Sequence, residues 1–531
     1  MLNLLLFSCA RVGAPNGGTR DSLAPKFLGS NIDTTRLNVS RTVKELRLDF
    51  DEYVMLKDFN KNFNVSPPIK KIKKVIPSNL ANKYVLIQWE DTLQANTTYN
   101  FNFGNAIVDN NESNPLPYFN FAFSTGDKID DLFVSGTVKD AMTLIKENQT
   151  AKDNKMVVGL YKAGENLDYK QKPDYITKVD EENYFELNFL PKGEFVIIAF
   201  DDENQNSVYD AGKEKVSFLK EKITLDSTSV RGLKLKLYPS KKVVKYKESK
   251  AINGGLLMTF EGNPETVEVK SLSEELKDFK VTHAKRSDSV NIWFDAEKSN
   301  LGGTVSKQVK LSYFTPTISD TISVSYKAVK EEFKLSNEAG NLIAPENNFV
   351  INTSLPIENL NTSSWKLESD SIAQDFTAKI SEKNPFKILV NSSFKPTKKY
   401  VLTIPKETVS SYYSSNDKSF QFQFEIDKPE NYGSFTAVIK NKPTAKFWVE
   451  LTNEKGEILY SQFTNASEVS FKNLKPATYI ARIRVDNNGN GFWDEADFAQ
   501  NIAAEDVYIF EKEINVRPLW EIKEDWELIN H

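Results

Sequence analysis

Apolar and polar residues alternate along most of this chain in short runs. Residues 84–89, 98–103 and 119–123 each follow this period of two, and turn-forming residues separate them. Because successive side chains of a strand point to opposite faces of a sheet, such runs predict half-buried strands. One short stretch, 271–278, is a candidate helix, and no long helical period with caps is present. The pattern predicts an all-β protein built of stacked β-sandwiches.

A polar stretch near the end of the chain has the spacing of a calcium-binding loop. In residues 486–497, oxygen-bearing side chains fall at positions 1, 3, 5, 9 and 12, and Gly491 stands at position 6. Alternate residues of a tightly turning loop can direct several oxygens at one hard cation, and glycine permits the bend at position 6. The predicted side-chain ligands, together with the backbone carbonyl of Phe492, are Asp486, Asn488, Asn490, Asp494 and Asp497. All are protein oxygens, which favours Ca²⁺ in a structural role, although a plain Asn-Gly turn remains the alternative.

The first nine positions of this loop recur 284 residues earlier, in residues 202–210. The flanks align at the same offset without a gap, with residues 190–195 against 474–479. The chain therefore contains two copies of a larger module that ends in the loop. The earlier copy is less complete, because position 6 is Ser207, position 12 is Lys213 and Glu214 lies one residue late. Its candidate ligands are Asp202, Asn204, Asn206 and Asp210.

Four stretches near the N-terminus carry a family resemblance. They are residues 50–54, 93–99, 107–109 and 123–126, which read FDEYV, LQANTTY, IVD and FSTG. Together they resemble the bacterial Ig-like domain of SbsA-type surface proteins. The resemblance implies an Ig-like sandwich in an envelope or surface protein, and it brings no catalytic residues.

The repeated module resembles a second family. Its order of a turn, residues 184–187 (YFEL) and residues 190–195 (LPKGEF) is similar to the prealbumin-like, carboxypeptidase-regulatory-like sandwich. Such domains are mostly spacers and binding scaffolds. The resulting division of the chain is 1–23, a truncated lipoprotein signal and flexible tether; 24–128, Ig-like; 129–244, prealbumin-like; 245–335, a β domain of unclear type; 336–427, degenerate Ig-like; and 428–531, a second prealbumin-like domain.

The single cysteine, Cys9, follows a short apolar run that ends in Leu6-Phe7-Ser8. This resembles a bacterial lipobox, in which the cysteine is lipidated and becomes the mature N-terminus. Only eight residues precede Cys9, fewer than the 15 to 30 of a usual secretory signal, which suggests a start further upstream. The alternative is a buried or free cysteine near the terminus. No other segment approaches the roughly 18 apolar residues of a membrane span.

Composition narrows the classes of function. With 68 basic and 73 acidic residues in 531, nothing favours nucleic acid as a partner. One cysteine and two histidines, His283 and His531, leave almost no material for cysteine nucleophiles or Ser-His-Asp triads. Paired carboxylates, as in glycoside hydrolases, remain open because their spacing in space is invisible in a sequence.

These observations predict a non-catalytic lipoprotein of the cell envelope, anchored in the outer membrane through Cys9. Its tandem sandwiches would act as a scaffold or interaction protein with an envelope protein as partner. The alternatives are a surface glycan-binding or adhesin protein, and a carboxylate-dependent glycoside hydrolase.

Overall fold

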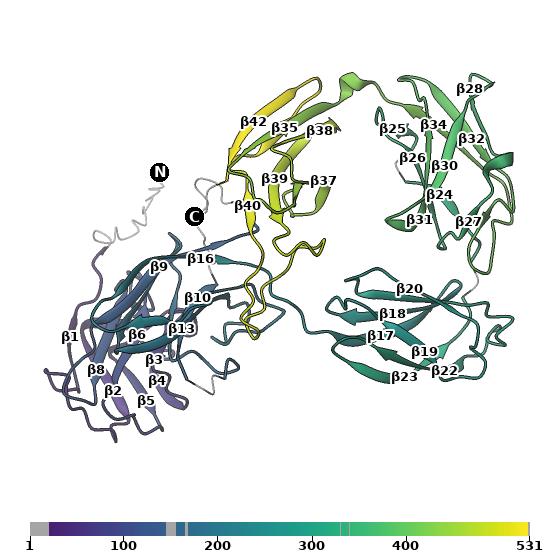
Figure 1. Ribbon diagram of the computed structural model, residues 1–531. Helices are drawn as coiled ribbons and strands as arrows, with labels where there is room; N and C mark the ends of the chain where they lie inside the picture. Colours follow the sequence, from purple (N-terminus) through teal and green to yellow (C-terminus); the bar gives the residue numbers. More distant parts are fainter. Residues whose placement is uncertain (1–20, 145–154, 165–167, 330, 339, 529–531) are drawn as a thin grey trace, which may run out of the picture. The chain divides into compact units, whose positions relative to one another are not determined.

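A computed structural model describes residues 21–144, 155–164, 168–329, 331–338 and 340–528. These residues form 42 strands, one short α-helix and two 3-10 turns, and the prediction of an all-β chain is confirmed (Figure 1). None of the helices among them is long and apolar enough to cross a bilayer. The described residues divide into two compact units, one mainly of residues up to Leu237 and one from Tyr238 onward, which also takes 140–144 and 211–215. Cys9 lies outside the described residues.

The first sandwich of the first unit packs two sheets around an aromatic core. Alternation along its strands sends Phe101, Phe103, Phe121 and Phe123 inward, where all four are almost fully buried. One sheet has the order β1-β2-β5-β4 with β7 beside β2, and the other has the order β3-β6-β8. The elements are β1 (Phe27–Ser30), β2 (Glu45–Leu56), α1 (Phe59–Asn62), β3 (Asn64–Ser66), β4 (Ile72–Ile76), β5 (Asn82–Trp89), β6 (Thr98–Gly104), β7 (Ile107–Asp109) and β8 (Phe119–Ser124).

The second sandwich of this unit, here called the first repeat module, spans β9 to β16. Its sheets have the orders β11-β10-β13-β14, with β15 also on β13, and β12-β9-β16. An aliphatic core that includes Val134, Leu160 and Ile197 fills the space between them. The strands are β9 (Leu132–Asp140), β10 (Met156–Lys162), β11 (Tyr175–Lys178), β12 (Tyr184–Leu190), β13 (Gly193–Asp201), β14 (Val216–Phe218), β15 (Ile223–Leu225) and β16 (Val230–Leu237).

The second unit begins with a sandwich of two antiparallel sheets, ordered β17-β18-β21-β20 and β19-β22-β23. Its core includes Met258, Ile292 and Leu311, each fully buried. The strands are β17 (Lys245–Ile252), β18 (Gly255–Glu261), β19 (Glu268–Ser271), β20 (Lys280–His283), β21 (Ser289–Trp293), β22 (Lys307–Phe314) and β23 (Ser319–Tyr326). The candidate helix at 271–278 is absent: Ser271 ends β19, and residues 272–278 form the loop that follows it.

The next sandwich repeats the strand order of the first one, with two additional edge strands, β25 on β34 and β29 on β28. The order β24-β26-β31-β30 corresponds to β1-β2-β5-β4, and β34-β32-β28 corresponds to β8-β6-β3. In this second copy β29 pairs with the outer edge of β28. The elements are β24 (Leu335–Asn337), β25 (Leu342–Ile343), β26 (Phe349–Thr353), β27 (Asn359–Leu360), η1 (Thr362–Ser364), β28 (Lys366–Ser369), β29 (Ile372–Ala373), β30 (Phe376–Ser381), β31 (Asn384–Ser392), β32 (Lys399–Ile404), β33 (Val409–Ser410) and β34 (Phe420–Ile426).

The last sandwich, here called the second repeat module, has the same strand order as the first repeat module. Its sheets are β37-β36-β39-β40, with β41 also on β39, and β38-β35-β42. Trp526 near the C-terminus is buried in the core, whereas Trp520 is half exposed. The elements are η2 (Pro429–Asn431), β35 (Gly433–Lys440), β36 (Phe447–Thr452), β37 (Ile458–Thr464), β38 (Glu468–Leu474), β39 (Ala477–Val485), β40 (Val507–Ile509), β41 (Ile514–Val516) and β42 (Glu521–Glu527).

Candidate metal-binding loop

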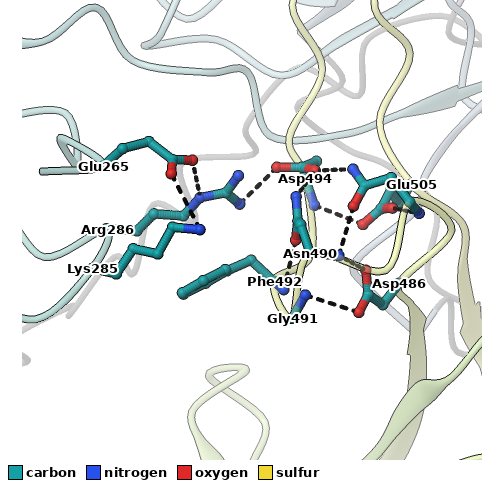
Figure 2. A network of polar contacts seen from close by, with 10 residues as sticks. Glu265, Lys285, Arg286, Asp486, Asn490, Gly491, Phe492, Asp494 and Glu505 are labelled. Atoms are coloured by element: carbon teal, nitrogen blue, oxygen red, sulfur yellow. Dashed lines mark hydrogen bonds and ion pairs between the residues drawn. The ribbon is translucent and has the colours of Figure 1, made fainter. Parts of the chain in front are cut away.

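The second polar loop begins where β39 ends, and its first residue is the best buried of the predicted ligands. Asp486 is 3% exposed. Its two carboxylate oxygens accept the backbone N–H groups of Asn490 and Gly491, each at 3.0 Å (Figure 2). A carboxylate that accepts two backbone N–H groups a few residues further along the chain stabilises a tight turn. The loop is therefore organised around Asp486.

Two asparagines carry the turn forward and converge on Asp494. The Oδ1 atoms of Asn488 and Asn490 accept the backbone N–H groups two residues further on, at 3.0 and 2.8 Å. Their Nδ2 atoms donate to one oxygen of Asp494, at 2.5 and 2.8 Å. The structure thus brings together Asp486, Asn488, Asn490 and Asp494 as the spacing predicted.

The predicted ligand at position 12 does not join this group. Asp497 Oδ1 accepts the backbone N–H of Gln500 at 3.2 Å. The backbone of Asp497 also pairs with that of Ile502, through N–H···O bonds of 2.8 and 2.9 Å. Asp497 is therefore engaged in a small hairpin of its own. Phe492, whose carbonyl was predicted as a ligand, packs its ring against the cationic groups of Lys285 and Arg286.

A residue that the spacing missed completes the group. Glu505 is 6% exposed and lies two residues before β40. Its two oxygens accept the backbone N–H groups of Asn488 at 3.1 Å and Asp494 at 3.0 Å. No search for a twelve-residue loop could find it, because it follows Asp494 by 11 residues. The signal that could have found it is its position just before the strand that closes the module.

The carboxylates of the group differ in their electrostatics. Burial opposes ionisation of Asp494, but hydrogen bonds from Asn488, Arg286 and Asn490 outweigh burial and lower its pKa. Arg286, which also donates to Glu265, contacts Asp494 at 2.6 Å (Figure 2). Burial raises the pKa of Glu505, and its backbone donors offset this only in part. Removal from water penalises the charged form, whereas donors favour it.

The first polar loop reproduces five of these hydrogen bonds. Asp202 accepts the backbone N–H groups of Asn206 at 3.0 Å and Ser207 at 3.1 Å. Asn204 Oδ1 accepts the backbone N–H of Asn206 at 3.0 Å, and its Nδ2 donates to Asp210 at 2.6 Å. Asn206 Oδ1 accepts the backbone N–H of Val208 at 2.6 Å. The four predicted residues of this loop therefore adopt the same fold as their counterparts.

The two loops reach this conformation with different residues. Positions 4 and 6 are left-handed in both copies: Gly489 and Gly491 have φ of 72° and 82°, and Gln205 and Ser207 have φ of 58° and 61°. Glycine adopts such angles freely, whereas other residues adopt them at a cost. A glycine at position 6 is therefore favourable for this loop and is not required by it.

Strand register identifies a counterpart of Glu505 in the first copy. β14 pairs with Ile198 and Phe200, and β40 pairs with Arg482 and Arg484, which lie 284 residues later. This register aligns Val216 with Val507, and so Glu214 with Glu505. Glu214 is 2% exposed. The stretch from Asp486 to Glu505 in the second loop is seven residues longer than the stretch from Asp202 to Glu214 in the first loop.

The longer loop also binds a preceding segment of the same unit. The backbone N–H of Lys241 donates to Ala496 O at 2.8 Å, and the N–H of Ala496 donates to Pro239 O at 3.1 Å. Ser240 and Ala496 accordingly form a parallel bridge. The additional residues of the second loop thus bind residues 239–241, which lie far away in the sequence.

Chemically, the second loop offers three carboxylates and two amide oxygens to a hard cation. Among the described residues, no group of three or more His, Cys, Asp or Glu side chains is already spaced to hold a metal ion. The amide N–H groups of Asn488 and Asn490 occupy the Asp494 oxygen that a cation would use. Ca²⁺ binding at this loop therefore requires these two side chains to rotate.

Comparison with known proteins places one part of the chain in a family. Residues 21–125 match the bacterial Ig-like domain family. No curated protein matches the chain. The resemblance of the first sandwich to a bacterial Ig-like domain is thus confirmed.

Three solved structures have partial similarity to the chain. The S-layer protein SbsC is 12% identical, with 93% of this chain and 67% of that chain covered and a TM-score of 0.15. BcpA, the major pilin subunit of Bacillus cereus, is 11% identical, with 75% and 99% covered and a TM-score of 0.13. A Bacteroides ovatus SGBP-B in complex with a mixed-linkage heptasaccharide is 10% identical, with 72% and 94% covered and a TM-score of 0.20. At these TM-scores, no functional conclusion follows from the three likenesses.

Proposed function

We propose that this protein is a non-catalytic scaffold of the bacterial cell envelope, anchored in the outer membrane through a lipid on Cys9. The observation that carries the proposal is the match of residues 21–125 to a bacterial Ig-like domain at the head of a chain of sandwiches. Sandwiches joined in series provide length and surface, and the apolar run before Cys9 would direct attachment of the lipid that anchors the chain. The expected partner is another envelope protein.

The anchor is tested by metabolic labelling of the producing bacterium with a clickable fatty acid, followed by membrane fractionation. The wild-type protein is expected to carry the label and to sediment with the outer membrane. Cys9→Ser is expected to lose the label and to leave the membrane fraction, while Ser8→Ala serves as the matched control. An unlabelled wild-type protein contradicts the anchor.

The scaffold role is tested by affinity purification from detergent-solubilised envelopes. Stoichiometric envelope proteins should be recovered with the wild-type chain. Recovery of the chain without companions contradicts this role, and retention on an immobilised envelope glycan would instead support the glycan-binding alternative.

Structural Ca²⁺ at the second polar loop is a further part of the proposal. Asp486, Asp494 and Glu505 supply three carboxylates that converge from separate parts of the module, and Asn488 and Asn490 add neutral oxygens. A cation bound there would neutralise the carboxylates and fix the connection between β39 and β40.

Thermal unfolding in excess Ca²⁺ or in chelator tests this part. At a concentration 100 times the Kd, one bound ion stabilises the folded state by about 2.7 kcal/mol. Asp486→Ala should abolish the shift in melting temperature. If Glu505→Gln loses the shift and Asp497→Ala keeps it, Glu505 rather than Asp497 is the last ligand. A wild-type melting temperature that does not respond to Ca²⁺ contradicts the site.

A further inference from the structure

One edge strand of the second repeat module is unusually open. β37 ends the sheet β37-β36-β39-β40 and, among the described residues, pairs only with β36. Ile458, Leu459 and Phe463 are 46%, 49% and 44% exposed. Between Ile458 and Thr464 the strand carries neither a charged residue nor a proline. Edge strands of natural proteins usually carry such residues, or are covered, because their free N–H and C=O groups invite another strand.

The equivalent strand of the first repeat module is covered. β11 holds the position of β37 in the same strand order, and Tyr175 and Ile176 on it are 2% and 8% exposed. It lies alongside β3 of the Ig-like sandwich. The backbone N–H of Ile176 donates to Ser66 Oγ at 3.2 Å. In the first unit, therefore, a neighbouring sandwich covers this edge.

The second unit cannot use the same arrangement. The strand that corresponds to β3 is β28, and β29 already pairs with its outer edge. Glu368 lies opposite Ala373, and Ser369 lies opposite Ile372. The preceding sandwich thus lacks the free edge that β3 presents to β11, and β37 has no equivalent cover.

We propose that β37 pairs antiparallel with β37 of a second copy of this chain, about a twofold axis at Ser461. Alternation from Phe463, which lies beside Trp448, places Ser461 on the same face of the strand. The pairing with β36 shifts register between Tyr460 and Ile458, so Leu459 is the extra residue of a bulge at the start of β37. In the symmetric pair Leu459 faces Phe463 of the second copy, and the two small Ser461 residues face each other. The two five-stranded sheets then form one continuous sheet.

The strand is complementary to itself in this register. Uncharged residues meet uncharged residues along its whole length, and Glu457 falls opposite Asn465 rather than opposite another acid. Apolar cross-strand pairs stabilise antiparallel strands, whereas like charges placed opposite each other destabilise them. Phe463 already stacks on Trp448 with ring centroids 4.4 Å apart, so the second copy would meet an ordered aromatic pair at this edge. A twofold interface requires each strand to be complementary to an identical strand. A strand that pairs with a different protein does not have to meet this condition.

The oligomeric state of the purified full-length chain tests the proposal, independently of where the protein is located. Light scattering after size-exclusion chromatography should give twice the chain mass of 60.3 kDa at tens of micromolar. Leu459→Lys should raise the dimer Kd at least tenfold, because it places a cation on the joined edges. Ile372→Lys, at a residue 66% exposed on the edge strand β29, is the matched control and should remain dimeric. A monomeric wild type, or a Leu459→Lys dimer of unchanged Kd, overturns the proposal.

A cross-link tests the register. In a Cys9→Ser background, Ser461→Cys places two thiols opposite each other, where antiparallel Cα separations of about 4.5–5.5 Å suit a disulfide. Mild oxidation should give a covalent dimer on a non-reducing gel. Ser467→Cys, beyond the end of β37, should not cross-link. Efficient cross-linking by Ser467→Cys but not by Ser461→Cys overturns the register.

Discussion

Glu505 Oε2 lies 3.0 Å from the backbone nitrogen of Asp494 and accepts its N–H. The other carboxylate oxygen accepts the N–H of Asn488 at 3.1 Å, so one buried side chain connects two points of the polar loop to the residues just before β40.

Glu505→Gln is expected to loosen this loop. The amide can offer its oxygen to only one of the two donors, and its NH₂ group faces the other. An unsatisfied buried donor costs about 1–3 kcal/mol. Hydrogen–deuterium exchange of residues 487–495 should accelerate at least fivefold, which corresponds to about 1 kcal/mol of local opening. Asp497→Asn is the control, and equal acceleration in both variants would contradict the assigned role.

The left-handed residues at position 6 allow a reciprocal exchange. Ser207→Gly should stabilise the first polar loop, and Gly491→Ser should destabilise the second, each by about 1 kcal/mol. Both residues have positive φ, 61° and 82°. Exchange of each loop's amide hydrogens should change about fivefold in opposite directions. Changes of the same sign would show that contacts other than backbone conformation dominate.

Asp109 at the end of β7 gives the Ig-like sandwich a pH-dependent element. Its carboxylate accepts the backbone N–H groups of Asn111, Glu112, Ser113 and Asn114. Burial opposes its ionisation, but these donors outweigh burial and lower its pKa. The stabilisation is therefore fully present above the unfolded pKa of about 3.9 and is lost as pH falls through the lower folded value.

Asp109→Asn should lower the melting temperature of this sandwich at pH 7, because the amide cannot accept all four donors. The difference from wild type should stay constant down to about pH 4 and shrink below it, as the wild-type carboxyl becomes protonated. Calorimetry from pH 3 to 7 measures both quantities. A difference that persists unchanged at pH 3 would contradict the electrostatic account.

Glu450 is fully buried on β36 between two arginines of β39. Arg482 and Arg484 contact its two oxygens at 2.7 and 2.5 Å. Register aligns this group with Gly159, Ile198 and Phe200 of the first repeat module, where the charges are absent. The same sheet therefore accepts either a charge network or an apolar face.

Glu450→Ala should destabilise the second repeat module by about 3–5 kcal/mol, because it leaves poorly solvated arginines without a counter-charge. The triple variant Glu450→Ala, Arg482→Ile, Arg484→Phe should lose less than this single variant, since it removes the uncompensated charges. Calorimetry of the unfolding transition of the second repeat module measures the stability of each variant relative to the wild type. A triple variant less stable than Glu450→Ala would contradict the expected order.

The sequence predicted most of what depends on local pattern. Alternation located β6 and β8, because a strand with one buried face needs an apolar residue at every second position. It also assigned Asp486, Asn488 and Asn490 to one loop, where their contacts span only two to five residues. The repeat was visible because both copies keep their flanks in the same register.

What lay out of reach depends on contacts between distant residues. Glu505 enters the loop from beyond an insertion, and no fixed spacing signals a residue brought back by a strand. Asp497 was assigned to the loop by spacing, and the hairpin between Asp497 and Ile502 engages it elsewhere. The openness of β37 was equally hidden, because it depends on β29, a two-residue strand in another sandwich.

The bridge between Ser240 and Ala496 has a mechanical consequence. Its two hydrogen bonds close the intervening chain, with two whole sandwiches, into a ring. Tension applied between residues 239 and 497 would load this clasp first and bypass those sandwiches. When these two hydrogen bonds break, the two sandwiches can extend in series while they remain folded. The end-to-end length of the chain then increases before any hydrophobic core is exposed.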